Sequence, residues 1–238
     1  MQDITDSIQQ VNWNQIANDL HNKGYVQIPD FLSFSHCQQL IDSYNIPNGY
    51  RKTVVMERYR FGLGEYKYYN YPLPDLIQTL REHIYPHLAP VANHWMNLLN
   101  IEKRFPSNLQ GLQAECYVND QLKPTPLILK YGYGGFNTLH QDLYGEVYFP
   151  LQAAIFLNKL DIDYSGGGEF VLTQQIPRAQ SKVIVLKPEQ GSMVIFTTNF
   201  RPMKGTKGFY RATMRHGVSE VTSGNRYTLG IIFHDAVS

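Results

Sequence analysis

The chain has 238 residues, 43% of them hydrophobic and 17% charged, and its 21 Lys and Arg nearly balance 20 Asp and Glu, leaving a formal net charge of +1. This balance excludes attraction of a polyanion by the whole molecule, so any nucleic-acid binding must come from a local patch. The only two cysteines, Cys37 and Cys116, lack the spacing of a disulfide framework or a zinc cluster, which predicts a reduced, cytoplasmic protein.

No apolar run approaches the roughly 20 residues that span a bilayer, and the first residues show no basic region followed by an apolar one. We therefore expect neither secretion nor membrane insertion. The length predicts a single domain over residues 1–238, with a helical N-terminal part over 1–110 and a β-rich core over 111–238.

Apolar residues at helical spacing predict helices at Trp13–Leu20 and around Cys37–Ile41, with the short strand Tyr25–Ile28 between them. Residues 45–71 are irregular and rich in Tyr, Arg and Gly. Such a segment either lines the mouth of a substrate site or simply packs on the body of the domain.

Residues Pro74–Asn100 predict a longer helix that is interrupted near Pro86 and Pro90. His83 and His87 on this helix have metal-like spacing. Because Pro86 lies between them and disturbs the helix, solvated or capping roles are favoured for both histidines.

After Pro106 the hydrophobic periodicity changes to two, which is typical of strands. Many short strands without intervening helices predict two packed antiparallel sheets, a mainly β jelly roll with the N-terminal helices packed on one sheet, an α+β arrangement. The predicted strands are Leu112–Val118, Leu127–Tyr131, Leu139–Leu143, Leu151–Leu157, Gly168–Thr173, Lys182–Leu186, Ser192–Thr197, Thr213–Val221 and Arg226–Phe233.

The run Leu139-His140-Gln141-Asp142 carries the strongest chemical signal. Successive side chains of a strand point to opposite faces, so His140 and Asp142 would face the same way. With the distant His216 they would complete a facial triad of two histidines and one carboxylate, which leaves positions of a non-haem Fe(II) open. His234 is a competing distal histidine, disfavoured because no arginine follows it.

Arg226 and Thr228 would share one face of the last strand, where a guanidinium and a hydroxyl suit a buried dicarboxylate. Alternatively, Arg226 projects to solvent or pairs with a structural carboxylate. A hydrolytic or structural zinc site could use the same triad but would leave Arg226 and Thr228 unexplained. A noncatalytic cupin-like metal-binding module would require further histidines near His140.

Residues 127–235 resemble the double-stranded β-helix core of the Fe(II)/2-oxoglutarate-dependent dioxygenases. The resemblance implies His140, Asp142 and His216 as catalytic iron ligands. It implies that Arg226, Thr228 and Tyr131 bind 2-oxoglutarate. The implied reaction consumes O2, hydroxylates a C–H bond and releases succinate and CO2, while a requirement for ascorbate is left open.

The run His140-Gln141-Asp142-Leu143-Tyr144-Gly145-Glu146 resembles more closely a bacterial oxygenase family assigned to oxidative demethylation of damaged nucleic-acid bases. The second arginine of such demethylases corresponds here to Ile232. A tyrosine that some prolyl hydroxylases use for 2-oxoglutarate falls at Phe156. Neither subclass fits completely, so hydroxylation of prolyl or other protein side chains, or of a small molecule, stays an alternative.

Tyr144, Tyr148 and the loop 200–211, which begins with Phe200 and Arg201, are expected to form walls of the substrate site. The loop interleaves aromatic residues with four cations, a pattern typical of sites that hold single-stranded or flipped bases. A solvated basic loop over a small pocket is the alternative. The run Gly166-Gly167-Gly168 is expected to be a structural turn that needs positive φ.

Overall fold

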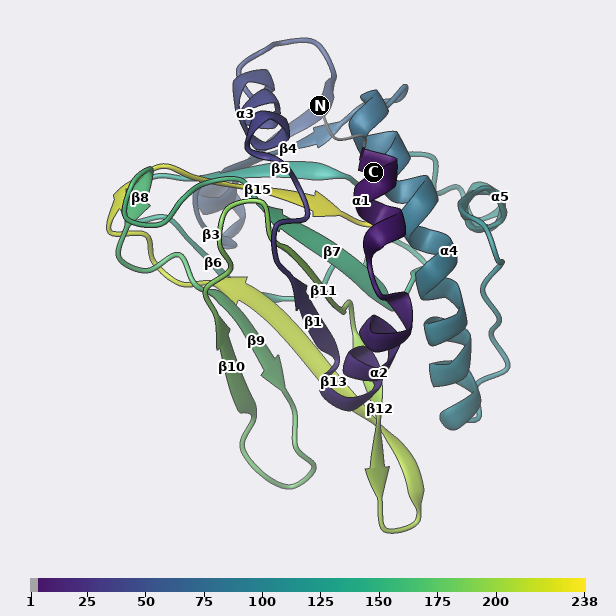
Figure 1. Ribbon diagram of the computed structural model, residues 1–238. Coiled ribbons are helices and arrows are strands. Elements are labelled where there is room, and N and C mark those ends of the chain that lie inside the picture. The colour runs from purple at the N-terminus through teal and green to yellow at the C-terminus, as the bar shows by residue number, and fades with distance from the viewer. Residues whose placement is uncertain (1–3) are drawn as a thin grey trace.

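The computed structural model of the chain describes residues 4–238, which form two large β-sheets and a separate two-stranded pair, with helices along one side (Figure 1). The helices are α1 (Ile4–Gln10), α2 (Trp13–Lys23), α3 (Phe34–Ser43), the 3-10 helix η1 (Met56–Tyr59), α4 (Asp75–Leu98) and α5 (Leu109–Val118). The strands are β1 (Tyr25–Ile28), β2 (Tyr50–Val55), β3 (Gly62–Leu63), β4 (Glu65–Tyr69), β5 (Leu127–Tyr131), β6 (Phe136–His140), β7 (Leu151–Phe156), β8 (Tyr164–Ser165), β9 (Phe170–Gln174), β10 (Lys182–Leu186), β11 (Met193–Thr197), β12 (Phe200–Gly205), β13 (Gly208–Val218), β14 (Ser223–Gly224) and β15 (Arg226–Ile231).

The larger sheet has seven strands in the order β1-β11-β7-β15-β5-β4-β2, and the smaller has five in the order β10-β9-β13-β6-β3, with β12 attached to β13 as a sixth. Neighbouring strands in both sheets are antiparallel. Strand β12 pairs with the first half of β13 and forms a separate hairpin. This architecture confirms the predicted mainly β jelly roll.

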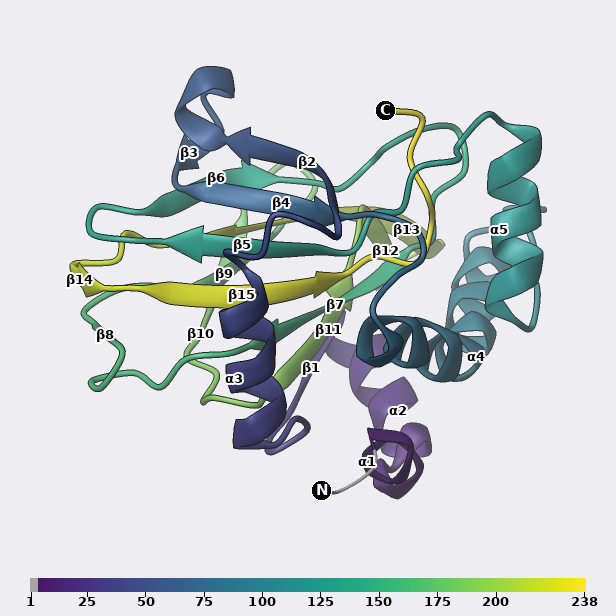
Figure 2. The ribbon, with the colours of Figure 1, turned by 90° about the horizontal axis from the view of Figure 1, so that it is seen from above.

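Helices cover the outer face of the seven-stranded sheet. Residues that alternate along β15, Tyr227, Leu229 and Ile231, belong to one large apolar core together with buried residues of α2, α3 and α4. Figure 2 shows this sheet with α3 lying across it and α4 at one end. The predicted packing of the N-terminal helices on one sheet is therefore confirmed.

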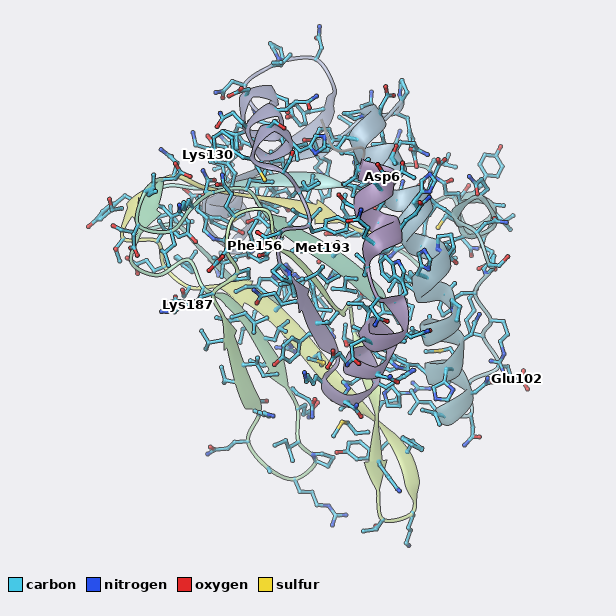
Figure 3. The ribbon with its side chains drawn as sticks, in the orientation of Figure 1. Asp6, Glu102, Lys130, Phe156, Lys187 and Met193 are labelled. Atoms are coloured by element: carbon cyan, nitrogen blue, oxygen red, sulfur yellow. The ribbon has the colours of Figure 1, made fainter. Side chains whose placement is uncertain are left out.

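A smaller apolar cluster lies between the two sheets. Phe156, Phe170 and Phe196 meet there edge to face, with ring centroids 4.9 to 5.7 Å apart. Figure 3 shows Phe156 and Met193 near the middle of the molecule and Glu102 at its edge. The inner face of the larger sheet is thus partly apolar, and polar groups occupy the rest of it.

The prediction of a strand at Leu112–Val118 is wrong, because these residues belong to helix α5. Leu109, Leu112 and Cys116 are buried at spacings of three and four, which is one face of a helix. The Asn108 side chain accepts a hydrogen bond from the backbone of Gly111 and caps the helix.

Helix α4 runs without interruption through Pro86 and Pro90, in contrast to the prediction. Both prolines lie on the exposed side of the helix, where water can satisfy the carbonyls that lose a hydrogen bond. His83 and His87 are also exposed, and the ring of His87 stacks on Trp13 at 4.3 Å, in agreement with solvated rather than metal-binding roles.

The N-terminal part over 1–110 contains strands as well as helices. Strand β1 extends the larger sheet beside β11, and the segment expected to be irregular forms β2, η1, β3 and β4. Strand β3 pairs with β6 and β4 pairs with β5, so this segment is built into both sheets. Among residues 4–238, no helix has the length and apolar character that a membrane span requires.

Candidate metal centre

The structure brings His140, Asp142 and His216 together. His140 ends β6 and lies directly opposite His216 in β13, with ring centroids 4.1 Å apart. Asp142 Oδ2 is 3.2 Å from His216 Nε2, and Asp142 Oδ1 is 3.7 Å from His140 Nε2. One ligand atom from each residue lies within 4.8 Å of the others, so the three side chains could hold one metal ion.

Asp142 follows the strand rather than lying in it, because β6 ends at His140. The predicted strand Leu139–Leu143 is therefore too long at its C-terminal end. The expected alternation still holds, since the amide of Gln141 points to the other side. It donates to the carbonyls of Asn199 and Met214, both at 2.9 Å.

A backbone contact fixes the tautomer of His140. Its Nδ1 lies 2.8 Å from the carbonyl oxygen of Thr138, which can only accept, so Nδ1 carries the proton. The lone pair of Nε2 then faces the triad. Burial, and to a smaller degree His216, lowers the pKa of His140 and favours the neutral form that ligates metals.

Two tyrosine hydroxyls hold the carboxylate of Asp142. Tyr144 donates to Oδ1 at 2.7 Å, and Tyr68 donates to the hydroxyl of Tyr144 at 3.1 Å. Burial alone would raise the pKa of Asp142, but His216, His140 and the hydrogen bond from Tyr144 keep it well below its usual range. Tyr144, expected to contact substrate, thus holds a candidate metal ligand and leaves Oδ2 facing His216.

Arg226 is buried in the same cavity as the triad, together with Thr228 and Tyr131. Its Nη1 donates to Thr228 Oγ1 at 2.8 Å, whereas its Nε and Nη2 have no partner among the described residues. Tyr131 lies opposite Arg226 in the sheet, and burial raises the pKa of Tyr131 to about 12, so its hydroxyl stays a donor.

An unpaired guanidinium in a buried site is costly unless a ligand completes its hydrogen bonds. The two free nitrogens of Arg226 fit the distal carboxylate of 2-oxoglutarate, and the triad in the same cavity fits its metal-binding end. The alternative, in which Arg226 projects to solvent or pairs with a structural carboxylate, does not describe the structure, since Arg226 is buried and has no ion pair among residues 4–238.

Two further polar residues of this cavity were not foreseen from the sequence. Gln152 points inward from β7 and has a buried Nε2 with no partner in the described part of the chain, and Asn137 donates to the hydroxyl of Tyr131 at 3.4 Å. Gln152 could have been noticed as the one polar residue in the apolar run Leu151–Phe156.

A second chamber opens beside His140 and Asp142 and has aromatic walls. Phe61, Tyr66, Tyr68 and Tyr144 line it. The rings of Tyr66 and Tyr68 meet at 86° with centroids 5.4 Å apart, and those of Tyr68 and Tyr144 meet at 90° and 6.1 Å. Of the two interpretations of residues 45–71, the structure therefore favours the mouth of a site.

Tyr148, Phe200 and Arg201 line neither the triad cavity nor the aromatic chamber. Arg201 is buried, and its guanidinium donates to Gln174 and to the carbonyl of His21 at 2.6 Å. The expected loop 200–211 belongs to the hairpin of β12 and β13, whose tip projects beyond the two large sheets (Figure 1). Its side chains do not form the expected substrate wall.

The glycine run lies behind Arg226. Gly166, Gly167 and Gly168 have φ of +59°, +73° and +69°, which confirms the expected structural turn. A Cβ at Gly168 would lie 2.9 Å from Arg226 Cδ, so the turn also leaves room for the arginine.

His234 lies outside the triad. Its Nδ1 accepts a hydrogen bond from the backbone of Phe149 at 3.2 Å, and burial lowers its pKa to about 4. The expected preference for His216 over His234 agrees with this geometry.

Residues 64–236 match the Oxygenase-NA family, described as an oxygenase catalysing oxidative methylation of damaged DNA. The chain belongs to this family. Other similar chains are the uncharacterized proteins MT2286 and Rv2227 of Mycobacterium tuberculosis, each 44% identical over 165 residues, which cover 69% of this chain and 70% of theirs.

Solved structures similar to this Oxygenase-NA protein share its fold at low identity. A prolyl-4-hydroxylase of Pseudomonas putida has a TM-score of 0.54 at 15% identity and covers 94% of this chain and 98% of its own. An oxidoreductase of the 2OG-Fe(II) oxygenase family from Burkholderia pseudomallei has a TM-score of 0.52 at 14% identity, covering 95% and 93%.

The family and the site agree on the enzyme class. The protein is an oxygenase, as the sequence predicts. The triad suits Fe(II), and the free donors of Arg226 suit 2-oxoglutarate.

Proposed function

We propose that this oxygenase removes N-methyl groups from bases of damaged nucleic acid. Two observations support the proposal: the family match, and above all the aromatic chamber that opens directly beside two of the three candidate metal ligands. Flat aromatic walls suit a planar base, because stacking on side chains holds a base that has left its stack.

In this proposal, His140, Asp142 and His216 hold Fe(II) through Nε2, Oδ2 and Nε2. The Thr138 carbonyl fixes the protonated Nδ1 of His140, and Tyr144 fixes the carboxylate of Asp142. These outer contacts keep the ligand atoms aimed at a common point without rearrangement when the metal binds.

Arg226 would bind the distal carboxylate of 2-oxoglutarate through Nε and Nη2, while its Nη1 stays bonded to Thr228. The hydroxyl of Tyr131 lies on the neighbouring strand and supplies a further donor. The cavity walls Phe170 and Phe196 exclude water around the cosubstrate.

Bound Fe(II) with 2-oxoglutarate and O2 supplies the oxidation of a C–H bond, with succinate and CO2 as the other products. Tyr66, Tyr68 and Phe61 would hold the base so that its methyl group faces the triad. Insertion of one oxygen atom converts N–CH3 to N–CH2OH, which then breaks its C–N bond to leave N–H and formaldehyde.

The test is succinate and formaldehyde formation by purified protein with Fe(II), 2-oxoglutarate and O2, with and without ascorbate. Parallel reactions contain no prime substrate, N-methylated single-stranded DNA, the same DNA without methyl groups, or proline-rich peptides. We expect methylated DNA alone to stimulate succinate and to release an equal amount of formaldehyde.

Stimulation by the peptides instead would replace base demethylation with prolyl hydroxylation. If protein with verified bound iron formed no succinate under any condition, the zinc or binding-module interpretation would have to be adopted.

A further inference from the structure

A pair of exposed aromatic rings stands at the outer edge of the chamber, one at the end of η1 and the other just before β3. Tyr59 is 55% and Phe61 is 44% exposed, and their rings stack at 19° with centroids 5.5 Å apart. Arg58 and Arg60 flank them, and both are exposed, with guanidinium groups that have no hydrogen-bond or ion-pair partner among residues 4–238. We name Arg58, Tyr59, Arg60 and Phe61 the aromatic rim.

The rim is held firmly although its side chains are exposed. Met56 is fully buried beneath it, the backbone of Phe61 donates to the Met56 carbonyl at 3.1 Å, and the backbone of Met56 donates to the Gly64 carbonyl at 2.9 Å. Glu57 accepts from the Gly64 backbone at 3.3 Å. A rigid ring pair binds a planar partner without the loss of much conformational freedom.

The rim is continuous with the metal site. Phe61 lines the same chamber as His140 and Asp142. The carbonyl of Phe61 accepts hydrogen bonds from both the backbone and the hydroxyl of Thr138, at 2.8 and 2.9 Å, and the Thr138 carbonyl in turn accepts from His140. A single-stranded nucleic acid bound on the rim would therefore be able to place the neighbouring base at the triad.

The cationic hairpin of β12 and β13 is less well placed for this task. His216 is eight residues along β13 from Gly208, about 26 Å at ~3.3 Å per residue, so Lys204 and Lys207 lie far from the triad. Arg201 is bonded internally, and Arg211 lies 5.0 Å from the ring of Phe200.

We propose that the aromatic rim binds a single-stranded nucleic acid next to the target base, with bases stacked on Tyr59 and Phe61 and phosphates paired with Arg58 and Arg60. Stacking plus local positive charge is the combination that holds single strands without reading their sequence. The inference rests on the proposed function, and it names the surface that delivers the substrate.

The test measures fluorescence anisotropy of a labelled, unmethylated single-stranded 12-mer and of its duplex. The protein is loaded with Mn(II) and 2-oxoglutarate so that no turnover occurs. We expect the wild-type protein to prefer the single strand and Tyr59→Ala with Phe61→Ala to weaken binding at least tenfold. Phe61→Trp should bind like the wild type, whereas Phe61→Leu, equally apolar but not aromatic, should lose binding.

Two charge variants complete the design. Arg58→Gln with Arg60→Gln should lower the slope of log affinity against log salt by about 1.4, since each lost phosphate contact on a single strand removes about 0.7. Lys204→Ala with Lys207→Ala removes the same number of charges from the distant hairpin and should leave binding and slope unchanged. Thermal unfolding of each variant checks that its fold is intact.

The rim proposal is overturned if the aromatic variants bind like the wild type, or if the lysine variant loses binding in their place. A failure of the proposed function is recognised separately. In that case the wild-type protein binds no oligonucleotide and methylated DNA does not stimulate succinate formation, whereas stimulation combined with unaffected rim variants rejects the rim alone.

Discussion

The two faces of the seven-stranded sheet have opposite chemistry, and strand β15 shows both. Its outward residues Tyr227, Leu229 and Ile231 join the apolar core beneath the helices. Its inward residues Arg226 and Thr228 line the cavity that contains the triad. One strand of six residues thus serves packing on one side and ligand binding on the other.

The outer face of the sheet stabilises the fold, whereas the inner face lowers its stability in favour of ligand binding. Four of the eleven buried side-chain atoms that lack a partner among residues 4–238 belong to residues lining the triad cavity, namely Nε and Nη2 of Arg226, Nε2 of Gln152 and Nδ1 of His216. Each such group destabilises the fold unless a ligand or water completes its bonding. Substitutions on the inner face should therefore damage function, and those on the outer face should damage stability.

The largest expected effect comes from the triad. Asp142→Ala removes its one carboxylate and should abolish iron-dependent succinate formation, and His140→Ala should do the same. The iron content of each purified variant should fall with it, measured by elemental analysis. Wild-type-like turnover in either variant would refute the assignment of the metal centre.

The second largest effect is expected from Arg226, which we propose to bind 2-oxoglutarate. Arg226→Met keeps an apolar chain but removes the donors for a carboxylate, and the KM for 2-oxoglutarate should rise by at least 100-fold, about 3 kcal/mol or more. The melting temperature should stay the same or increase, because a buried and partly unpaired charge has been removed. A large loss of stability with an unchanged KM would show that Arg226 is structural.

A matched substitution on the outer face should lower the stability of the protein and leave the KM for 2-oxoglutarate unchanged. Leu229 follows Thr228 in β15 and points to the opposite face. Leu229→Ala leaves a cavity in the apolar core and should destabilise the protein by about 2–5 kcal/mol. Denaturant unfolding measures this loss. The KM for 2-oxoglutarate at a temperature where the variant is folded should equal that of the wild type, and a shift in KM would mean that the two faces are not independent.

A smaller effect is expected from the hydroxyl that holds Asp142. Tyr144→Phe keeps the ring in the chamber but removes the 2.7 Å hydrogen bond to Oδ1. Loss of such an outer contact weakens metal binding by roughly 10- to 100-fold, which titration with Mn(II) would measure. Tyr148→Phe, which lies outside both cavities, is the control, and equal metal affinities in the two variants would contradict the role given to Tyr144.

The smallest effect is expected from the hydrogen bond between Trp95 and His21, which joins two helices. Trp95, fully buried, donates to Nδ1 of His21 at 2.8 Å, and burial, with His94 and Arg201 nearby, lowers the pKa of His21. Because the unfolded chain binds this proton more readily, stability should fall as the pH drops below the ordinary histidine pKa of 6.5. His21→Gln can still accept from Trp95 and should weaken that pH dependence in unfolding experiments; an identical pH profile would exclude His21 as its source.

The metal centre could be predicted from the sequence because its chemistry restricts the residue types. Few side chains ligate iron, and His140 and Asp142 are close in the chain, so alternation along a strand already places them together. Arg226 and Thr228 follow the same rule on the last strand. Long-range pairing was required only for His216.

The aromatic chamber could be suggested but not assembled from the sequence. Its walls come from residues 61–68, 127–129 and 137–144, and nothing local in these segments specifies that β3 pairs with β6. Helix α5 was missed for a different reason. Leu112, Cys116 and Val118 fit an alternating strand, whereas the cap at Asn108 and the helical spacing of Leu109, Leu112 and Cys116 favour the helix.

Thr138 connects the entrance of the chamber to the metal centre. Its backbone and hydroxyl bind the carbonyl of Phe61 at the entrance, while its own carbonyl binds the ring of His140 at the centre. A partner that shifts the entrance would change the hydrogen bond that sets the imidazole, and by thermodynamic reciprocity the metal would change the affinity of the entrance for that partner by the same factor. Metal binding at the centre and nucleic-acid binding at the entrance would then be coupled through Thr138.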